Sequence, residues 1–407
     1  MKATRLGSEE VTYQDRISHL HDDLLLRILS LVPVRTAMST SLLSKRWRYV
    51  WKMTPTLVYD ETCPYIGPLG FDQFCSVYLP SHEALKTLNL KLGKYSDSID
   101  TLVFPNISSN IQEMTINLNY YYSYYTPITF PINVNVFKTL LVLKLQGRIV
   151  LDVVDSPVCF PSLKILHLTC VNFLCEESFT RLLPACPVLE DLFLQRLCSR
   201  DRFLFNMSVP SLQRLSITPE PAYYNSDEPR LEISTPYLKY VNIFDRSGYY
   251  NFLEDMPKLV EADVSVDMSR NEKLLTVLSS AEHLVICLYP SMTYPKTTED
   301  QLYCLGSEPS SVPNCLSFHL ESIQWRGYGG TPDERAAAAY VLKNAHRLKT
   351  ATINGALGYS VPMATCQPLL HSPMWKFKAF VKPNVFVDLF DKNGVFISEE
   401  WNASITS

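Results

Sequence analysis

Apolar residues follow a helical period in the first part of this chain. Between residues 17 and 52 they recur every three or four positions, which predicts three short amphipathic helices. Asp22 and Asp23 offer N-cap side chains to the first helix. Pro33 ends that helix and opens the second, and Ser44 is a cap for the third. The predicted apolar stripes are Leu25, Ile28, Leu29 and Val32, then Val34, Ala37, Met38 and Leu42, then Trp47, Val50 and Trp51.

Further along, the apolar pattern changes to Leu-x-x-Leu-x-Leu. Copies in one frame begin at residues 85, 111, 140, 163, 189, 212, 238 and 259, at intervals of 21 to 29 residues. Later copies begin at Leu320 and Leu348, and one near Leu284 is ambiguous in register. Such intervals are typical of leucine-rich repeats, whose units must stack because a single unit cannot bury its apolar face. We therefore predict an α/β leucine-rich-repeat solenoid, a parallel-sheet horseshoe with its leucines inward.

Five copies have a proline two residues before the first leucine, and this predicts a turn that leads into each strand. Two segments interrupt the pattern. Residues 119–127 are a tyrosine-dense loop, either a recognition loop or an insertion without a role. The stretch between Leu284 and Leu320 predicts a long loop or a boundary. The prolines are Pro161, Pro187, Pro210, Pro236 and Pro257.

Period-2 alternation places the residues between the leucines on the open face of the predicted sheet. On neighbouring strands this face carries Phe193, Tyr240 and Phe244, with Arg214 between them. Aromatic and arginine side chains dominate binding hot spots, so these four are the candidate substrate-binding residues. The alternative is that they are scattered solvent-facing side chains. The open-face set is Ile165, His167, Thr169, Asp191, Phe193, Gln195, Arg214, Ser216, Thr218, Tyr240, Asn242, Phe244, Glu261, Asp263 and Ser265.

Residues 312–353 predict a strand, a glycine turn, a helix and a second strand. Asp333 and Glu334 at the predicted helix start would repel an anion, and no Lys-Ser/Thr follows the glycines, which argues against a phosphate-binding loop. Further on, residues 385–390 and 395–398 flank a turn signal and predict a hairpin that closes the sheet. The assignments are Leu320, Ile323 and Trp325 to the strand, Gly327, Gly329 and Gly330 to the turn, Thr331, Pro332 and Glu334 to the cap, and Ala337, Tyr340, Val341, Ala345 and Leu348 to the buried helix stripe.

The helical segment carries Leu20, Leu24-Leu25, Ile28-Leu29, Pro33, the run Thr40–Ser44 and Lys45-Arg46-Trp47. In this combination it resembles a plant F-box. The resemblance implies an interface for a Skp1-type adaptor and, through it, a cullin-RING ubiquitin ligase. The alternative is a helical hairpin that packs only on its own chain. The family usually has Leu-Pro where this chain has Leu20-His21, which removes a pre-set φ and predicts weaker adaptor binding. The implied adaptor-binding residues are Leu20, Leu25, Ile28, Leu29, Pro33, Leu42, Leu43 and Trp47.

A second resemblance covers the strand–turn–helix–strand segment. It is similar to the FBD domain that follows F-box and repeat regions in plant proteins, and no biochemical role follows from that resemblance. The matching residues are Pro313, Cys315, Leu316, Leu320, Trp325, Tyr328, Gly329, Gly330, Asn344, Ala345 and Leu348. The predicted division of the 407 residues is an F-box module over 12–56, leucine-rich repeats over 57–311, and the FBD unit with its hairpin over 312–407.

Charge is unevenly distributed along the chain. Residues 12–56 carry a net charge of +4, and residues 57–407 carry −8 of an overall −4. An acidic body argues against nucleic acid as a partner, and no apolar run is long enough to span a bilayer. The first ten residues lack the apolar stretch of a signal peptide, so we expect the cytoplasm or nucleus. Eleven cysteines without framework spacing are expected to be reduced and mostly buried.

Neither catalytic nor metal-binding motifs assemble in the sequence, and we expect no cofactor. Two hypotheses remain. In the first, the protein is a non-catalytic substrate receptor of a ubiquitin ligase, with an F-box that binds the adaptor and a repeat that binds a protein substrate. In the second, the repeat is a binding scaffold that acts without ubiquitination. A small-molecule or inositol-phosphate receptor would need a basic pocket, and the acidic body argues against it.

Overall fold

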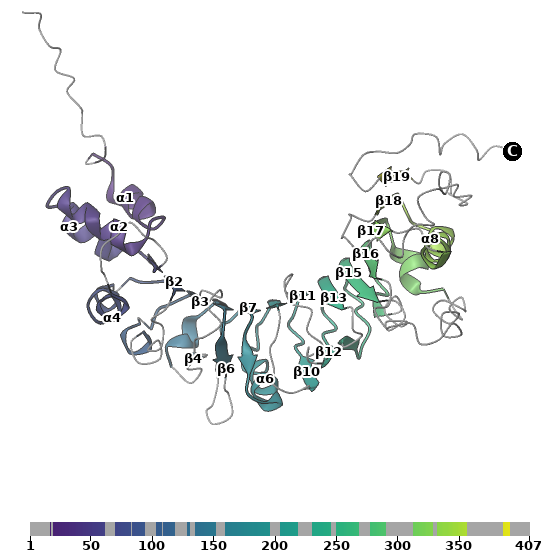
Figure 1. The fold of residues 1–407 in the computed structure, drawn as a ribbon, viewed down its shortest axis with the longest axis horizontal. Coiled ribbons are helices and arrows are strands. Elements are labelled where there is room, and N and C mark those ends of the chain that lie inside the picture. Colours follow the sequence, from purple (N-terminus) through teal and green to yellow (C-terminus); the bar gives the residue numbers. More distant parts are fainter. Residues whose placement is uncertain are drawn as a thin grey trace, which may run out of the picture. The chain divides into compact units, whose positions relative to one another are not determined.

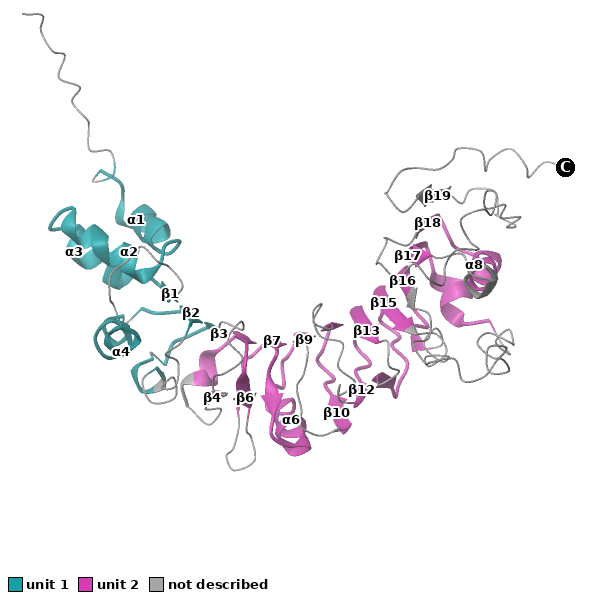
Figure 2. Ribbon diagram, in the orientation of Figure 1, with its two compact units in different colours: residues 1–119 teal, residues 120–407 magenta. Residues whose placement is uncertain are grey.

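The structure is a computed structural model that divides into two compact units, residues 1–119 and 120–407 (Figure 2). Each unit is described by itself. The first unit contains more than the predicted helical module, since it also includes three strands. The residues described are 17, 19–61, 70–82, 84–93, 103–107, 109–118, 128–130, 135–151, 159–195, 204–218, 230–245, 250–267, 277–289, 312–328, 332–355 and 386–390.

Three short helices open the first unit, as the apolar period predicts (Figure 1). Two of their predicted starts were wrong. The first helix begins at Asp22 itself with His21 as its N-cap, and the third begins at Trp47, three residues after Ser44. Asp22 therefore contributes a first-turn carboxylate, which favours the helix through its dipole. The elements are α1 (Asp22–Leu29), α2 (Val34–Ser39), η1 (Thr40–Leu42), α3 (Trp47–Val50) and η2 (Trp51–Met53).

The helices lead into a parallel sheet after only two residues, Thr54 and Pro55. The strands β1, β2 and β3 lie in that order, and the repeat-pattern residues Leu88 and Leu90 on β2 and Met114 and Ile116 on β3 are buried. The Arg35 guanidinium of α2 lies 5.5 Å from the ring centroid of Tyr59 on β1, so the module packs directly on the first strand. The remaining elements of this unit are β1 (Thr56–Asp60), α4 (Phe71–Gln73), the π-helical η3 (Phe74–Tyr78), η4 (Leu79–Ser81), β2 (Thr87–Leu92), η5 (Phe104–Asn106) and β3 (Glu113–Leu118).

The second unit is built on a long parallel sheet, which confirms the predicted repeat solenoid. Its strand order is β5-β7-β9-β11-β13-β15-β16-β17-β18-β19. Along β7 and β9 buried and half-buried residues alternate, so the leucines are inside and the intervening residues lie on the other face. The strands are β5 (Val142–Gln146), β7 (Ile165–Thr169), β9 (Asp191–Gln195), β11 (Arg214–Thr218), β13 (Tyr240–Asp245), β15 (Glu261–Asp267), β16 (His283–Tyr289), β17 (Ser322–Tyr328), β18 (Thr350–Gly355) and β19 (Phe386–Phe390).

The predicted proline turns are present before the strands. The N–H of Leu163 donates to the Phe160 carbonyl at 3.3 Å, which closes a turn with Pro161 at its second position. Proline suits that position because its φ is already set. The structure also resolves the ambiguous copy near Leu284. Leu284 pairs with Ala262 and Ile323, so this copy is Ala281, Leu284 and Ile286, and all three are buried.

The return segments contain regular structure that the sequence reasoning did not predict. Two small parallel sheets, β4-β6-β8 and β10-β12-β14, lie outside the main sheet. Phe179 stacks on Phe205 with ring centroids 4.6 Å apart, which joins the helix α6 to β10 within the core. These elements are β4 (Ile128–Phe130), η6 (Asn135–Thr139), β6 (Ile149–Leu151), β8 (Asn172–Phe173), α6 (Glu176–Leu182), β10 (Leu204–Ser208), β12 (Arg230–Ser234) and β14 (Tyr250–Phe252).

The C-terminal segment folds as strand, helix and strand, as predicted, with η9 (Cys315–His319) before β17 and α8 (Pro332–Asn344) before β18. One assignment was wrong, because Gly327 lies inside β17 and not in the turn. It has φ of +68° at an irregularity in the pairing with β18, so a β-bulge explains the glycine. The tyrosine-dense loop 119–127, Gly329 to Thr331 and the second predicted hairpin strand, 395–398, lie outside the described residues.

Candidate binding surfaces

The helical module has an apolar core of its own. Leu25, Leu29, Ala37, Trp47, Val50 and Trp51 are buried together, and Leu20, Val32 and Met38 pack against them. Trp47 is 3% exposed although the unit is small. This core is complete without a partner, so the residues that remain outside it define the surface available for binding.

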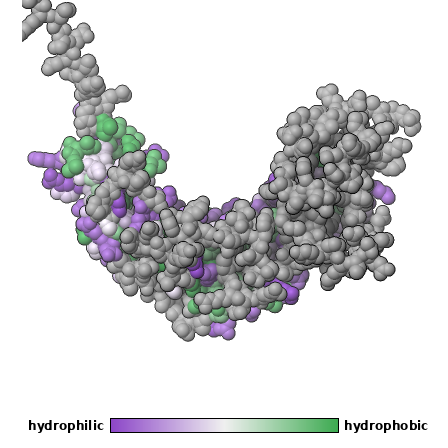
Figure 3. All heavy atoms as spheres, viewed as in Figure 1, coloured by the Kyte–Doolittle hydropathy of each residue, from purple (hydrophilic) through white to green (hydrophobic). Residues whose placement is uncertain are grey.

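Several large apolar residues remain on the module's surface. Leu42 is 88% exposed, Leu31 84% and Leu43 62%. Figure 3 shows apolar residues gathered over this part of the chain. Exposed apolar side chains in such density are typical of an interaction surface. We call this the module surface, and it consists of Leu24, Ile28, Leu31, Leu42, Leu43, Tyr49 and Met53.

The predicted adaptor-binding residues divide into two groups. Ile28, Leu42 and Leu43 are exposed, and they belong to the module surface. In contrast, Leu25, Leu29 and Trp47 are buried in the module's own core, while Leu20 and Pro33 are half-buried. The three buried residues form the core that supports the module surface. Contact of the eight residues with an adaptor stays a prediction.

Sequence reasoning missed part of the module surface, although a signal was present. Leu24, Ile28 and Leu31 are spaced i, i+4 and i+7, a second apolar stripe interleaved with that of Leu25 and Leu29. Ile28 was predicted both in the apolar stripe of the first helix and among the adaptor-binding residues, and at 46% exposure it lies on the module surface. A helix with two apolar stripes is apolar on more of its circumference than one core can cover, which indicates a second contact.

The predicted substrate-binding residues lie on the open face, which we define as the half-buried or exposed positions of β7 to β18. Phe193 is half-buried and tilted against His167, with ring centroids 5.3 Å apart. The exposed Arg214 sits on β11 between Phe193 and Tyr240, but its Nε donates to Asp191 Oδ2 at 3.0 Å. Phe193 pairs with Ser216 and not with Arg214, and Phe244 lies four residues beyond Tyr240 on β13. The four residues therefore occupy three levels of the sheet across three strands and form no tight cluster.

A further arginine reaches this face from the C-terminal segment. Arg326 Nη1 on β17 lies 3.0 Å from Asp263 Oδ2 on β15, two strands away. Sequence reasoning placed Asp263 on the open face but could not find its partner, which is 63 residues away in the chain. Burial and the nearby carboxylate of Asp263 raise the pKa of Tyr240, so its hydroxyl stays protonated at neutral pH.

Three buried cysteines of the described residues are poor nucleophiles. Burial raises the pKa of the Cys75 and Cys186 thiols to about 12 and that of Cys315 to about 11, so these three remain thiols. Among the described residues, no group of three or more His, Cys, Asp or Glu side chains could hold a metal ion. Within the same part of the chain, no helix has the length and apolar character needed to cross a membrane.

Three protein-family models match segments of this chain. The F-box domain model matches residues 17–59, the FBD model matches residues 308–353, and the repeats of the FBD-associated F-box protein At5g56370 match residues 105–233. Among curated proteins, the chain is 57% identical over 403 residues to the putative F-box/FBD/LRR-repeat protein At5g56810 of Arabidopsis thaliana. That alignment covers 87% of this chain and 93% of the relative. The chain belongs to the plant F-box/LRR/FBD family.

Other members of the family align over most of the chain as well. The putative FBD-associated F-box protein At5g56820 of Arabidopsis thaliana is 46% identical, with 87% of this chain and 89% of that protein covered. The F-box/FBD/LRR-repeat protein At5g56420 of the same plant is 35% identical, with 84% and 92% covered. The F-box match thus falls on the helical module and its first strand, and the FBD match reaches from before η9 to β18.

Proposed function

We propose that this F-box/LRR/FBD protein is a substrate-receptor subunit of an SCF-type (Skp1–cullin–F-box) ubiquitin ligase. In this role the module surface binds a Skp1-type adaptor and the open face binds a protein substrate. The observation that carries the proposal is the exposure of Leu31, Leu42 and Leu43 on a helical unit whose own core is already filled. Burying one exposed leucine side chain in an interface contributes about 1.5–3 kcal/mol, so a few such residues supply substantial affinity.

The module surface also has the charge that suits an acidic adaptor. Lys45, Arg46 and Arg48 follow the exposed Leu42 and Leu43 in the sequence, and residues 12–56 carry a net charge of +4. Complementary charge raises the association rate and selects the partner, while the apolar contacts supply most of the affinity. We therefore propose a Skp1-type protein as the partner of this surface and no nucleic acid.

The proposed mechanism requires no catalytic group from this chain. A receptor that holds substrate and ligase together raises the effective concentration of a substrate lysine near the ubiquitin-loaded enzyme. The direct packing of α2 on β1 supports this role, since it joins the module to the first repeat without a linker. A short connection of this kind keeps a bound adaptor close to the first strands.

Co-purification with a plant Skp1-type adaptor tests the first part of the proposal. The full-length chain should bind the adaptor, and the double variant Leu42→Asp, Leu43→Asp should lose at least tenfold in affinity, because two charges would enter an apolar interface. The matched control is Leu174→Asp, an exposed leucine of the second unit, which should bind like the wild type. No binding by the intact protein would end the proposal.

A second experiment separates the receptor from a scaffold that acts without ubiquitination. Proximity labelling by the wild-type protein, with and without proteasome inhibition, should reveal neighbours that accumulate when degradation is blocked. The Phe193→Ala, Tyr240→Ala variant should lose these neighbours while it still binds the adaptor. Unchanged labelling by this variant would remove these two residues from the substrate-binding surface.

A further inference from the structure

One end of the open face carries an aromatic pair on adjacent strands. His167 on β7 lies directly opposite Phe193 on β9, and their ring centroids are 5.3 Å apart. Both side chains are half-buried, so part of the pair remains accessible. Burial, followed by the ammonium group of Lys144, lowers the pKa of His167, and its ring is therefore neutral at neutral pH. The pair thus offers an uncharged aromatic contact to a partner.

Lys144 lies beside this pair on the neighbouring strand. It is the residue of β5 that pairs with His167 on β7, and its side chain is exposed. Within the ranges that the structure describes, Lys144 makes no hydrogen bond and no ion pair. An exposed ammonium group therefore remains available next to the aromatic contact.

Arg214 stands on the other side of the aromatic pair, with one edge of its guanidinium group bound. Its Nε donates to Asp191 Oδ2 at 3.0 Å, while His167 Nε2 lies 3.9 Å from Oδ1 of the same carboxylate. The Nη nitrogens of Arg214 make no hydrogen bond within the described residues, and its side chain is 56% exposed. A guanidinium group is planar and binds a carboxylate through two parallel N–H donors. Asp191 therefore orients the group and leaves its Nη edge free for a second carboxylate.

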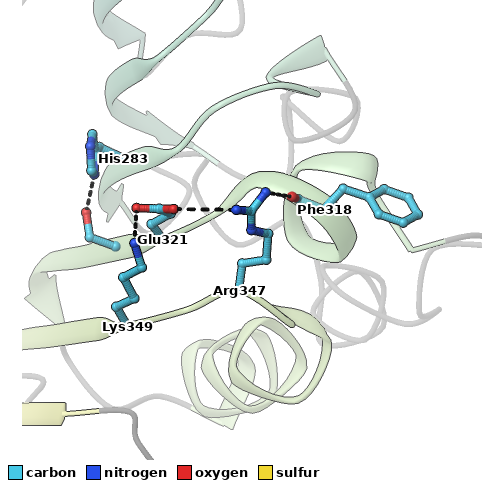
Figure 4. A network of polar contacts seen from close by, with 6 residues as sticks. His283, Phe318, Glu321, Arg347 and Lys349 are labelled. Atoms are coloured by element: carbon cyan, nitrogen blue, oxygen red, sulfur yellow. Dashed lines mark hydrogen bonds and ion pairs between the residues drawn. The ribbon is translucent and has the colours of Figure 1, made fainter.

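Several other basic side chains along this sheet are already neutralised. Lys349 Nζ lies 2.7 Å from Glu321 Oε2, and Arg347 lies at the other oxygen of that carboxylate (Figure 4). Arg326 lies 3.0 Å from Asp263. Lys144 and the Nη edge of Arg214 differ from these cations, because no carboxylate of the described residues covers them. In a chain of net charge −4 they place positive charge on both sides of one aromatic contact.

The strand order sets the distance between these two cations. The strands β5, β7, β9 and β11 are consecutive in the sheet, so Lys144 and Arg214 are separated by three strand intervals, about 14 Å. An extended peptide rises about 3.3 Å per residue, and its residues i, i+2 and i+4 lie on one face. A segment of four residues therefore spans the two cations, and its middle residue lies over the aromatic pair.

We propose that this end of the open face binds an extended acidic segment of a protein substrate, in which an aromatic or aliphatic residue has one acidic residue two positions before it and another two positions after it. The apolar side chain packs on His167 and Phe193. One acidic side chain pairs with Lys144, and the other pairs with the Nη edge of Arg214. This inference rests on the proposed function, because it names the substrate chemistry for the same face.

Random-sequence peptides displayed on phage are the probe for the predicted spacing. Selection on the purified full-length chain should enrich Asp or Glu two positions before and two positions after an aromatic or aliphatic residue. One enriched peptide is then synthesised, together with a peptide of the same composition in which the two acidic residues are adjacent. The second peptide should bind about fivefold more weakly, since it reaches only one of the two cations.

Arg214 is tested for both its charge and its geometry. Arg214→Gln should weaken binding of the enriched peptide about tenfold, and Arg214→Lys should also weaken it, because an ammonium group keeps the charge but lacks the two parallel donors. Arg214→Gln also uncovers Asp191, which would repel the peptide. The double variant Asp191→Asn, Arg214→Gln removes this repulsion and should still bind more weakly than the wild type.

Lys144→Gln tests the other end of the site. It should weaken binding about threefold, the effect of losing one exposed ion pair. The matched control is Arg230→Gln, because Arg230 is an exposed residue of β12, which lies in a small sheet outside the main one. This control makes the same change in net charge and should leave the affinity unchanged. Thermal unfolding of each variant checks that it is folded.

Three outcomes would overturn the inference. These are a selected pool without the acidic–apolar–acidic spacing, equal affinity of the two synthetic peptides, and equal affinity of Lys144→Gln and Arg230→Gln for the enriched peptide. Adaptor binding by the wild-type chain is measured separately. Its absence would refute the proposed function, whereas the peptide measurements judge the substrate segment.

Discussion

Arg46 Nε lies 2.9 Å from Asp22 Oδ1, and this pair joins the first residue of α1 to the residue that precedes α3. A second nitrogen of the same guanidinium, Nη2, donates to the Leu20 carbonyl at 2.6 Å. Arg46 therefore holds the chain on both sides of His21. The next residue, Trp47, enters the core of the module. Within the Lys45-Arg46-Trp47 motif, Arg46 thus binds the residues at the start of α1, and Trp47 packs in the core of the module.

The residue between these two contacts of Arg46 is His21, at which this chain differs from the usual F-box pattern. His21 has φ of −62° and ψ of 149°, a backbone that proline adopts without strain. Among the described residues, no hydrogen bond uses the His21 N–H. We predict that His21→Pro raises the free energy of unfolding of the module by about 0.4–1 kcal/mol, because it restricts the unfolded chain. Chemical denaturation of wild type and variant measures this, and a loss of stability would contradict it.

Core and surface of the module should respond differently to substitution. Trp47→Ala removes a buried side chain and should lower the free energy of unfolding by about 3–5 kcal/mol. Leu42→Asp changes an exposed side chain and should alter the free energy of unfolding by less than about 0.5 kcal/mol, while the affinity for the adaptor falls. Denaturation and adaptor affinity measured on both variants separate a structural from a contact role. If Leu42→Asp unfolded the module, Leu42 would have a structural role, and this would contradict its assignment to the module surface.

The buried His82 predicts a pH dependence of the first unit. Its Nδ1 lies 2.8 Å from the Tyr78 carbonyl and its Nε2 lies 3.2 Å from the Trp51 carbonyl. Burial lowers the pKa of His82 below its ordinary value of 6.5, with Lys52 acting in the same direction. The unfolded chain therefore binds the proton first as the pH falls. Stability from this group is complete above pH 6.5 and is lost as the pH drops below that value.

Urea denaturation at a series of pH values tests the role of His82. The wild-type free energy of unfolding should decrease below the ordinary histidine pKa. The His82→Gln variant should be less stable at neutral pH, since it loses ring packing against Trp51 at a centroid distance of 5.3 Å, but it should lack this part of the pH slope. Equal slopes for the two proteins would assign the pH dependence to other groups.

The bulge in β17 predicts a glycine requirement. Gly327→Ala should cost about 1–2 kcal/mol, because φ of +68° is unfavourable for residues with a Cβ, and Gly327→Val should cost more. Gly70→Ala is the matched control. At Gly70 the φ is −61° and an added Cβ meets nothing within 4 Å, so the change should be within about 0.5 kcal/mol. Equal effects at the two positions would exclude the bulge as the reason for Gly327.

Much of this protein follows from local pattern. Spacing of leucines predicts the repeats and their inward face, since alternation along a strand is a property of the backbone. The prolines before the leucines predict the turns for the same reason, because a fixed φ acts locally. The three helices of the module also follow from their apolar period, although their starts did not, because Ser44 and Asp22 are good caps that the chain does not use.

Other features depend on which segments meet in space. The packing of the module buries Leu25 and Trp47 and leaves Ile28 exposed. On α1, other helices cover the apolar stripe that contains Leu25, and they do not cover the stripe that contains Ile28. Only the strand order brings Arg326 to Asp263, since these two residues come from different strands. The sequence by itself determined the repeats, the helical module and their family. Tertiary structure decided which side chains are available to a partner, because burial and ion pairing depend on neighbours that are distant in the chain.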